Sequence, residues 1–213
     1  ASATVTVTGS GGGGGIVGNM ESEFEDAYVT ACRFSGNVRT NYDYGRIGGI
    51  VGGTTHGDCH IDACYANCIL TVGGLGEKES QNRVGGVAAT LNGYMTGCYA
   101  VVEVEGEDLA AVGGGVGYLV TEGYGDTTFD SSANACYWSA ERNNVSFGTG
   151  GSGFINDNAS EGATNEGTIQ VNGSDWSAAK ETMNAVLSDT GWQYKENTGS
   201  DKTVFPLIVE KVQ

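Results

Sequence analysis

Short stretches in which apolar and polar residues alternate recur in the first half of the chain. The clearest reads Val-Glu-Val-Glu-Gly at residues 102–106, and looser versions occupy residues 69–73 and 5–9. A period of two is typical of a β-strand with one buried face. Because a glycine ends each stretch, the pattern predicts short strands that end at turns.

A glycine-rich phrase occurs four times. Residues 14–18 read Gly-Gly-Ile-Val-Gly, and the phrase returns at residues 48–52, 85–89 and 113–117, at intervals of 34, 37 and 28 residues. Such glycines suit a sharp corner with positive φ, or a place where neighbouring backbones pass closely. The third copy has Ala88-Ala89 in place of Val-Gly, which leaves the geometry of its turn open. The glycines that define the repeat are Gly14, Gly15, Gly18, Gly48, Gly49, Gly52, Gly85, Gly86, Gly113, Gly114 and Gly117.

A cysteine follows each copy of the glycine phrase, at Cys32, Cys64, Cys98 and Cys136. Two markers that keep one order over periods of about 30–40 residues indicate stacked units, none of which buries its apolar face alone. We therefore predict an all-β fold, a parallel β-helix or β-solenoid of about four Gly-rich repeats, with roughly three strands per coil.

Equivalent residues of successive coils should form ladders in such a stack. The four cysteines would make one buried column, because a small apolar thiol packs well inside a protein. Alternation along a strand would then point the next residue outward. In the last three repeats that residue is a tyrosine, namely Tyr65, Tyr99 and Tyr137.

The repeats divide the chain into three parts. We expect residues 1–150 to be the solenoid, with a first repeat truncated at its N-terminus, so that the chain is the C-terminal part of a longer array. Residues 151–173 read as a polar connection, and residues 174–213 as a small α+β cap.

The predicted cap has one helix and two strands. Ala179, Met183 and Leu187 have helical spacing, and residues 192–194 and 204–209 read as a final strand pair. A solenoid exposes its core and its strand edges at the last coil, so a cap is required there. We expect this segment to cover that open end with Trp176, Met183 and Phe205.

The glycine phrase, the Cys-Tyr pair and the valine-rich strand together resemble the GLUG-motif repeat proteins. The similarity covers about residues 1–150, and residues 183–187 with 205–208 look like the tail that such proteins often carry. The resemblance implies a secreted or surface protein of gut Bacteroidetes, anchored to the outer membrane through a part that precedes this chain. GLUG motifs accompany large adhesins and immunoglobulin-A-cleaving metallopeptidases. The family offers no catalytic residue or cofactor to carry over.

Composition excludes several classes of protein. Of the 213 residues, 37 are glycine and one is proline, which is far from the glycine share and proline content of collagen. A net charge of −16 argues against nucleic-acid binding, which depends on Lys and Arg. No apolar stretch approaches the roughly 18 residues needed to span a bilayer. No basic start followed by an apolar segment occurs, so no signal peptide is expected.

Histidines and cysteines are densest at residues 56–68, and the candidate zinc ligands are His56, Cys59 and His60. Cys64 and Cys68 share strand parity with His60, but four residues along a strand span about 13 Å, too far for ligands to meet unless the chain turns. Packing in a ladder or turn is the alternative. Secretion would permit a disulfide between Cys59 and Cys68, although we expect mostly free, buried thiols.

Acidic residues form two runs, at residues 21–26 and 103–108. Glu103 and Glu105 share an outward face, where paired carboxylates could cleave a polysaccharide as acid and base. The alternative is a solvated face that keeps strand edges apart. Exposed tyrosines that could stack on sugars are Tyr42, Tyr44, Tyr118 and Tyr124.

Two further motifs match known sites only in part. Gly13, Gly15 and Gly18 fit the dinucleotide fingerprint, which requires a helix after the glycines. Residues 156–162 resemble a calcium loop with a misplaced glycine and without the glutamate at its twelfth position. The net charge would also attract Ca²⁺ without a dedicated site.

We therefore expect a non-enzymatic surface module, an adhesin or a display stalk, that binds a protein or glycan at the cell surface. The loops at residues 19–28, 40–46, 74–83 and 118–132 would be its variable contact elements. The alternatives are a β-helix that binds or cleaves polysaccharide, and a non-catalytic domain of a surface metallopeptidase.

Overall fold

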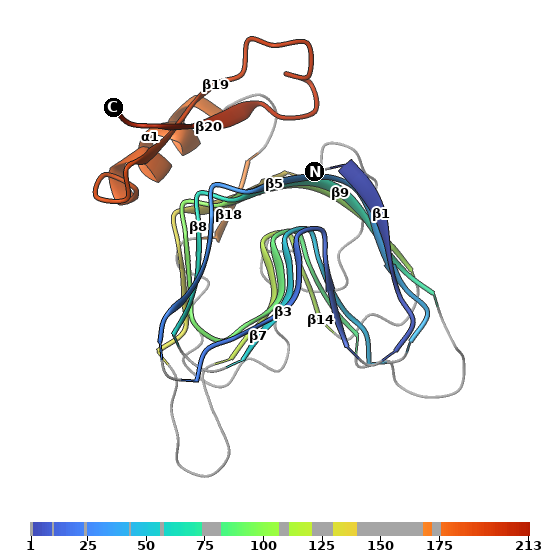
Figure 1. Cartoon of the computed structure of the whole chain (residues 1–213). Coiled ribbons are helices and arrows are strands. Elements are labelled where there is room, and N and C mark those ends of the chain that lie inside the picture. The colour runs from blue at the N-terminus through green and yellow to red at the C-terminus, as the bar shows by residue number, and fades with distance from the viewer. Residues whose placement is uncertain are drawn as a thin grey trace.

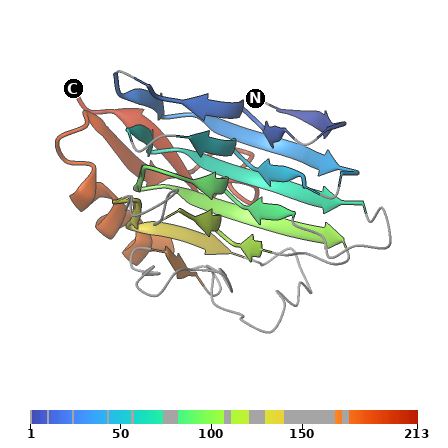
Figure 2. The ribbon, with the colours of Figure 1, turned by 90° about the horizontal axis from the view of Figure 1, so that it is seen from below.

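The computed structural model describes residues 2–9, 11–23, 25–42, 44–55, 58–73, 82–106, 111–120, 130–139, 168–171 and 176–213. These residues form a parallel β-solenoid, with one short helix and a small antiparallel sheet near the C-terminus. Figure 1 views the stack along its axis, so that the coils lie over one another, and Figure 2 shows the strands side by side. The predicted fold class is confirmed.

Four parallel sheets run along the stack, and each coil contributes one strand to each sheet. The long sheet contains β1 (Ser2–Val7), β5 (Arg33–Thr40), β9 (Tyr65–Val72), β13 (Tyr99–Gly106), β17 (Cys136–Ser139) and β18 (Thr168–Gln170). The first arm contains β2 (Gly12–Gly14), β6 (Arg46–Gly48), β10 (Arg83–Gly85) and β14 (Ala111–Gly113). The second arm contains β3 (Val17–Glu21), β7 (Val51–Thr55), β11 (Ala88–Leu91) and β15 (Val116–Leu119). The side sheet contains β4 (Ala27–Thr30), β8 (Cys59–Asp62), β12 (Tyr94–Thr96) and β16 (Ser132–Asn134).

Each coil therefore has four strands, and the prediction of three is wrong. The extra strand arises because the glycine phrase reverses the chain between the two arms and folds the coil inward, so that the reversal lies beneath the long sheet (Figure 1). The second glycine of each phrase contacts the inner face of that sheet. A Cβ at Gly49 would lie 2.7 Å from Cβ of Ala66, and one at Gly114 would collide with the Trp138 ring.

Close backbone approach explains these glycines, and positive φ does not. Positive φ among the described residues occurs outside the phrase, and four of these positions lie at the corner between the side sheet and the long sheet, where Ala31, Ala63, Gly97 and Ala135 have φ between 49° and 57°. A Cβ at Gly52 would instead collide with the Gly13 nitrogen, across the two arms. The phrase thus lets two backbones touch where side chains would hold them apart.

The third copy of the phrase keeps the turn of the others. In the second copy the amides of Ile50 and Val51 both donate to the Val87 carbonyl at 2.9 Å. In the third, the amides of Val87 and Ala88 both donate to the Gly115 carbonyl, at 2.8 and 3.1 Å. The alanines therefore leave the turn geometry unchanged.

The C-terminal segment packs beside the stack, and the prediction that it covers the open end is wrong. It consists of α1 (Trp176–Val186) and an antiparallel pair, β19 (Trp192–Glu196) and β20 (Leu207–Lys211). Figure 1 shows this unit outside the long sheet. It meets the stack in a second apolar cluster that contains Tyr65, Tyr99 and Tyr137 together with Trp176, Met183, Leu187, Tyr194, Phe205 and Leu207.

The tyrosine ladder is the physical reason for this position. Tyr65 and Tyr99 leave the outer face of the long sheet, as predicted, and stack with ring centroids 5.0 Å apart. The C-terminal unit buries both rings, and the Tyr99 hydroxyl donates to the Leu207 carbonyl at 2.5 Å. Aromatic side chains bury large apolar areas, so the burial of the tyrosine ladder stabilises the C-terminal unit in this position.

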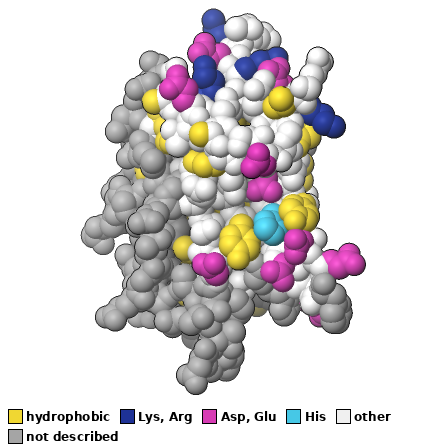
Figure 3. Space-filling view, turned by 90° about the vertical axis from the view of Figure 1, so that its left-hand side faces the viewer, with side chains coloured by type: hydrophobic (Ala, Val, Ile, Leu, Met, Phe, Trp, Pro, Cys, Tyr) yellow, Lys and Arg dark blue, Asp and Glu magenta, His cyan; other side chains and the backbone are white. Residues whose placement is uncertain are grey.

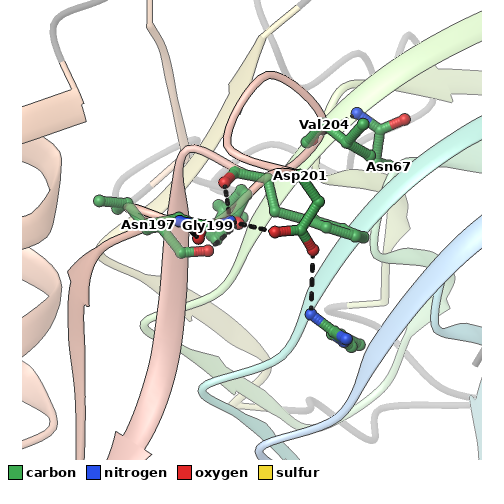
Figure 4. Close-up of polar contacts among 9 residues, drawn as sticks. Asn67, Asn197, Gly199, Asp201 and Val204 are labelled. Carbon is green, nitrogen blue, oxygen red and sulfur yellow. Dashed lines mark hydrogen bonds and ion pairs between the residues drawn. The ribbon is translucent and has the colours of Figure 1, made fainter.

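A short loop between β19 and β20 fastens the unit to the first two coils (Figure 4). The Asn197 amide donates to Asp201 at 2.9 Å and to the Phe205 carbonyl at 2.8 Å, which shapes the loop. The Asn67 amide donates to the Val204 carbonyl at 2.6 Å. Arg33 meets Asp201 at 3.5 Å, an exposed pair that adds little stability.

Candidate functional site

The predicted zinc ligands do not converge. In β8, Cys59 faces the core and is fully buried, whereas His60 faces outward from the side sheet. Cys64 lies at the next corner and Cys68 inside the long sheet, next to Gly49. His56 lies outside the described residues. Within the described part of the chain, no group of three or more His, Cys, Asp or Glu side chains is placed to hold a metal ion.

All six cysteines are free thiols, and five of them are buried, in agreement with the expectation. The four cysteines of the ladder also take part in hydrogen bonds with the backbone, which the sequence did not indicate. The Cys64 amide donates to Sγ of Cys98 at 3.4 Å, and that sulfur also lies 3.3 Å from the Ile61 carbonyl of the preceding coil. The four thiols of the ladder, Cys32, Cys64, Cys98 and Cys136, thus lie at the corner where the backbone turns left-handed, and they partner amides and carbonyls that leave the sheets there.

The carboxylates Glu103 and Glu105 share the outer face of β13, as the alternation predicts. Their partners on the neighbouring strand β9 are Ile69 and Thr71, and the Thr71 hydroxyl donates to Glu105 at 3.2 Å. An aromatic platform beside the acids would favour polysaccharide cleavage, and β9 provides none at these positions.

The predicted sugar-stacking tyrosines are dispersed. Tyr42 and Tyr44 are exposed at one corner, with tilted rings 6.4 Å apart. Tyr118 lies on the second arm, with the guanidinium of Arg83 3.8 Å from its ring centroid. Tyr124 lies outside the described residues.

The remaining motifs gain no support. Gly13 and Gly15 are followed by strand β3, which contains Gly18, and not by a helix, so the dinucleotide fingerprint lacks the element that it requires. The calcium-like loop at 156–162 lies outside the described residues, as do residues 74–81 and 121–129 of the predicted contact loops.

The side sheet carries an ordered aromatic surface on its outer face. Tyr28, His60 and Tyr94 occupy the same position of β4, β8 and β12. Tyr28 and His60 stack with ring centroids 4.7 Å apart, and His60 and Tyr94 at 5.1 Å. We call these three residues the aromatic row. Figure 3 shows this face, with the histidine between hydrophobic side chains and acidic groups around them.

Stacking determines what the aromatic row can contact. The middle ring, His60, presents one face to Tyr28 and the other to Tyr94, so a ligand can meet only its edge. Tyr28 ends the row and is 59% exposed, which leaves one ring face open to a sugar or an apolar side chain. The pairing of β4, β8 and β12 holds the three rings at fixed spacing, so the surface is preorganised for binding.

Acidic and polar groups border the aromatic row. The Tyr28 hydroxyl donates to Asp26 at 2.8 Å, and this hydrogen bond raises the pKa of Tyr28. Two residues further along the same strands, and therefore on the same face, lies a second ladder of Thr30, Asp62 and Thr96. Burial raises the pKa of Asp62, and the opposing effects of His60 and Thr96 are smaller. The surface therefore offers hydrogen-bond acceptors beside the aromatic rings.

The sequence drew attention to His60 as a metal ligand and did not mark Tyr28 or Tyr94. The signal that could have found the row is the spacing from each residue to its following cysteine. Tyr28, His60 and Tyr94 each precede the cysteine of their own repeat by four residues.

Comparison of the chain with protein-family models, curated proteins and solved structures found no match. No helix among the described residues is long and apolar enough to span a membrane.

Proposed function

We propose that this chain is a non-enzymatic recognition module of a secreted or surface-anchored bacterial protein, an adhesin or display stalk. The observation that carries the proposal is the aromatic row, which presents Tyr28, His60 and Tyr94 in register on an open, rigid sheet. The resemblance of the repeats to GLUG-motif proteins supports the same cellular setting.

The ligand is a glycan or a protein at the cell surface. The exposed face of Tyr28 suits the apolar face of a sugar ring or an aliphatic side chain. Asp26 and the ladder of Thr30, Asp62 and Thr96 supply acceptors and hydroxyls that fix its orientation. This combination of a stacking surface with a few placed polar groups is typical of binding sites.

A glycan and extracellular-matrix array tests the proposal, run with and without Ca²⁺. Wild-type protein should bind a restricted set of spots, and Tyr28→Ala should reduce that signal about tenfold or more, because a lost aromatic contact of about 1.5 kcal/mol corresponds to that factor. Tyr44→Ala is the matched control, since Tyr44 is similarly exposed on a different face. Equal binding by wild type and Tyr28→Ala would contradict the proposal.

A further inference from the structure

Two arginine side chains lie next to one another between the two arms. Arg46 and Arg83 occupy the same position of β6 and β10, one rung apart, on the face of the first arm that is turned away from the core. Their guanidinium groups therefore stand near one another in a chain of net charge −16. Within the described part of the chain, no ion pair links either arginine to a carboxylate.

The second arm faces these arginines with small and polar residues. A Cβ placed on Gly53 would lie 3.9 Å from Cδ of Arg46, 3.9 Å from Cβ of Thr90 and 3.4 Å from Oδ1 of Asn19. Arg83 lies over the ring of Tyr118, which pairs with Thr90 on the next rung. The arginine stems, the threonine and the glycine thus meet between the arms.

Thr90 is the second, independent sign of a ligand. Its side chain is 2% exposed, and its Oγ1 has no hydrogen-bond partner. An unpaired buried hydroxyl costs free energy, so native proteins rarely keep one without a role. Here the hydroxyl lies on the face of the second arm that meets the two arginines.

We propose that Arg46, Arg83 and Thr90 form a binding site for an oxyanion, namely a carboxylate, sulfate or phosphate group. Guanidinium groups donate paired N–H bonds in a fork that matches such groups, and the Thr90 hydroxyl donates a further bond. The anion neutralises two like charges that otherwise repel. In agreement, burial lowers the pKa of Arg83, and Arg46 lowers it further.

The site is independent of the aromatic row, which belongs to the side sheet. Its oxyanion can be a free inorganic ion or an acidic group of a glycan, and the two sources share one chemistry. Calorimetric titrations with sodium sulfate, with a glucuronate oligosaccharide and with a neutral oligosaccharide separate them, all at one ionic strength. Binding of sulfate alone identifies a free anion, and binding of the glucuronate chain identifies a glycan. If neither binds, the proposal is overturned.

Variants assign the binding to these residues. Arg46→Gln and Arg83→Gln should abolish the affinity, whereas Arg39→Gln should keep it, because Arg39 lies on the long sheet and bonds to Thr6. Thr90→Val should weaken binding roughly tenfold, the loss of one hydrogen bond to a charged group. Without the anion, Thr90→Val should be at least as stable as wild type, because it removes an unpaired hydroxyl.

A Thr90→Val variant that binds the anion less tightly, but is no less stable without it, has lost a contact with the ligand. Loss of a purely structural contact would lower the stability instead. If the arginine variants fail to fold, Thr90→Val alone decides the matter. Unchanged affinity of that variant for the bound anion would overturn the proposal.

Discussion

Gly49 shows how a single missing side chain determines the path of a whole coil. A Cβ there would collide with the Gly86 carbonyl oxygen and lie 2.7 Å from Cβ of Ala66. Both neighbours belong to the packed interior, so neither can move aside cheaply. The glycines of the phrase therefore hold the reversal of each coil against the long sheet.

Gly49→Ala should lower the free energy of unfolding by about 3 kcal/mol, the upper part of the range for overpacked cores, because one collision is with backbone. Urea denaturation followed by circular dichroism measures this. Gly11→Ala is the control, since a Cβ at Gly11 meets nothing within 4 Å, and it should change stability little. A Gly49→Ala protein as stable as the control would show that the reversal does not pack against the long sheet as described.

The cysteine ladder makes a second prediction at this scale. Native protein should react with a thiol reagent at Cys32 only, and slowly, because Cys32 alone is partly exposed and its hydrogen bond to Cys64 raises its pKa. Denatured, unreduced protein should release all six thiols. Fewer than six after denaturation would reveal a disulfide and contradict the free ladder.

Among the elements, the contact between α1 and the stack depends on another glycine. Gly97 has φ +57°, and a Cβ on it would lie 2.7 Å from Cγ of Leu187, just after the helix. Alanine itself tolerates this backbone, since Ala31 and Ala63 adopt it in other coils. The glycine at this one corner therefore makes room for the C-terminal unit.

Gly97→Ala should destabilise the protein by about 1–3 kcal/mol through this overpacking. Leu187→Ala should also destabilise, but the double variant should lose less than the sum of the two, because the collision disappears. A double-mutant cycle by urea denaturation measures the coupling. Additive losses would mean that Gly97 and Leu187 do not touch.

The strands were predictable because alternation and repeats are local patterns, as residues 102–106 show within β13. The fourth strand of each coil was not, because a Gly-Gly turn gives no sign of whether it bends the chain outward or inward. The side sheet strands β8 and β12 have only 4 and 3 residues, too few for a clear period.

The position of the C-terminal unit and the aromatic row were missed for a related reason. Tyr65 was correctly placed on the outer face, but the residue that covers it, Phe205, is remote in sequence. Tyr28 and Tyr94 become neighbours of His60 only when the register of the coils is known. Contacts of this kind depend on which residues of successive coils lie side by side. The sequence pattern predicts that the coils stack, but it does not give this register.

The whole molecule should lose stability in alkali. Burial raises the pKa of Tyr99 and Tyr194 well above 10.0, and that of Cys98 well above 9.0. These groups stay neutral in the folded protein while the unfolded chain ionises at the ordinary values. The stability that these groups contribute is therefore complete below the ordinary pKa values, and it is lost progressively as the pH rises from those values toward the raised pKa values of the folded protein.

The urea midpoint should thus be constant near neutral pH and fall above about pH 9. Tyr99→Phe removes one titrating group along with its bond to Leu207, so this variant should be less stable at neutral pH but decline less steeply above about pH 10. A midpoint that stays level into strong alkali would mean that these side chains are not buried.

At the largest scale, the molecule is a stack of coils in which each sheet presents a different outer surface. The C-terminal unit covers the part of the long sheet that carries the tyrosine ladder, whereas the aromatic row of the side sheet is exposed (Figures 1 and 3). We propose that recognition occurs on the side sheet without chemical change of the ligand.

Nuclear magnetic resonance titration of isotope-labelled protein with the strongest array ligand tests that claim most directly. Amide shift changes should concentrate on β4, β8 and β12, around Tyr28, His60 and Asp62, and the ligand should be recovered intact. Shift changes centred on Glu103 and Glu105, with ligand fragments in solution, would contradict the claim and identify a cleaving enzyme.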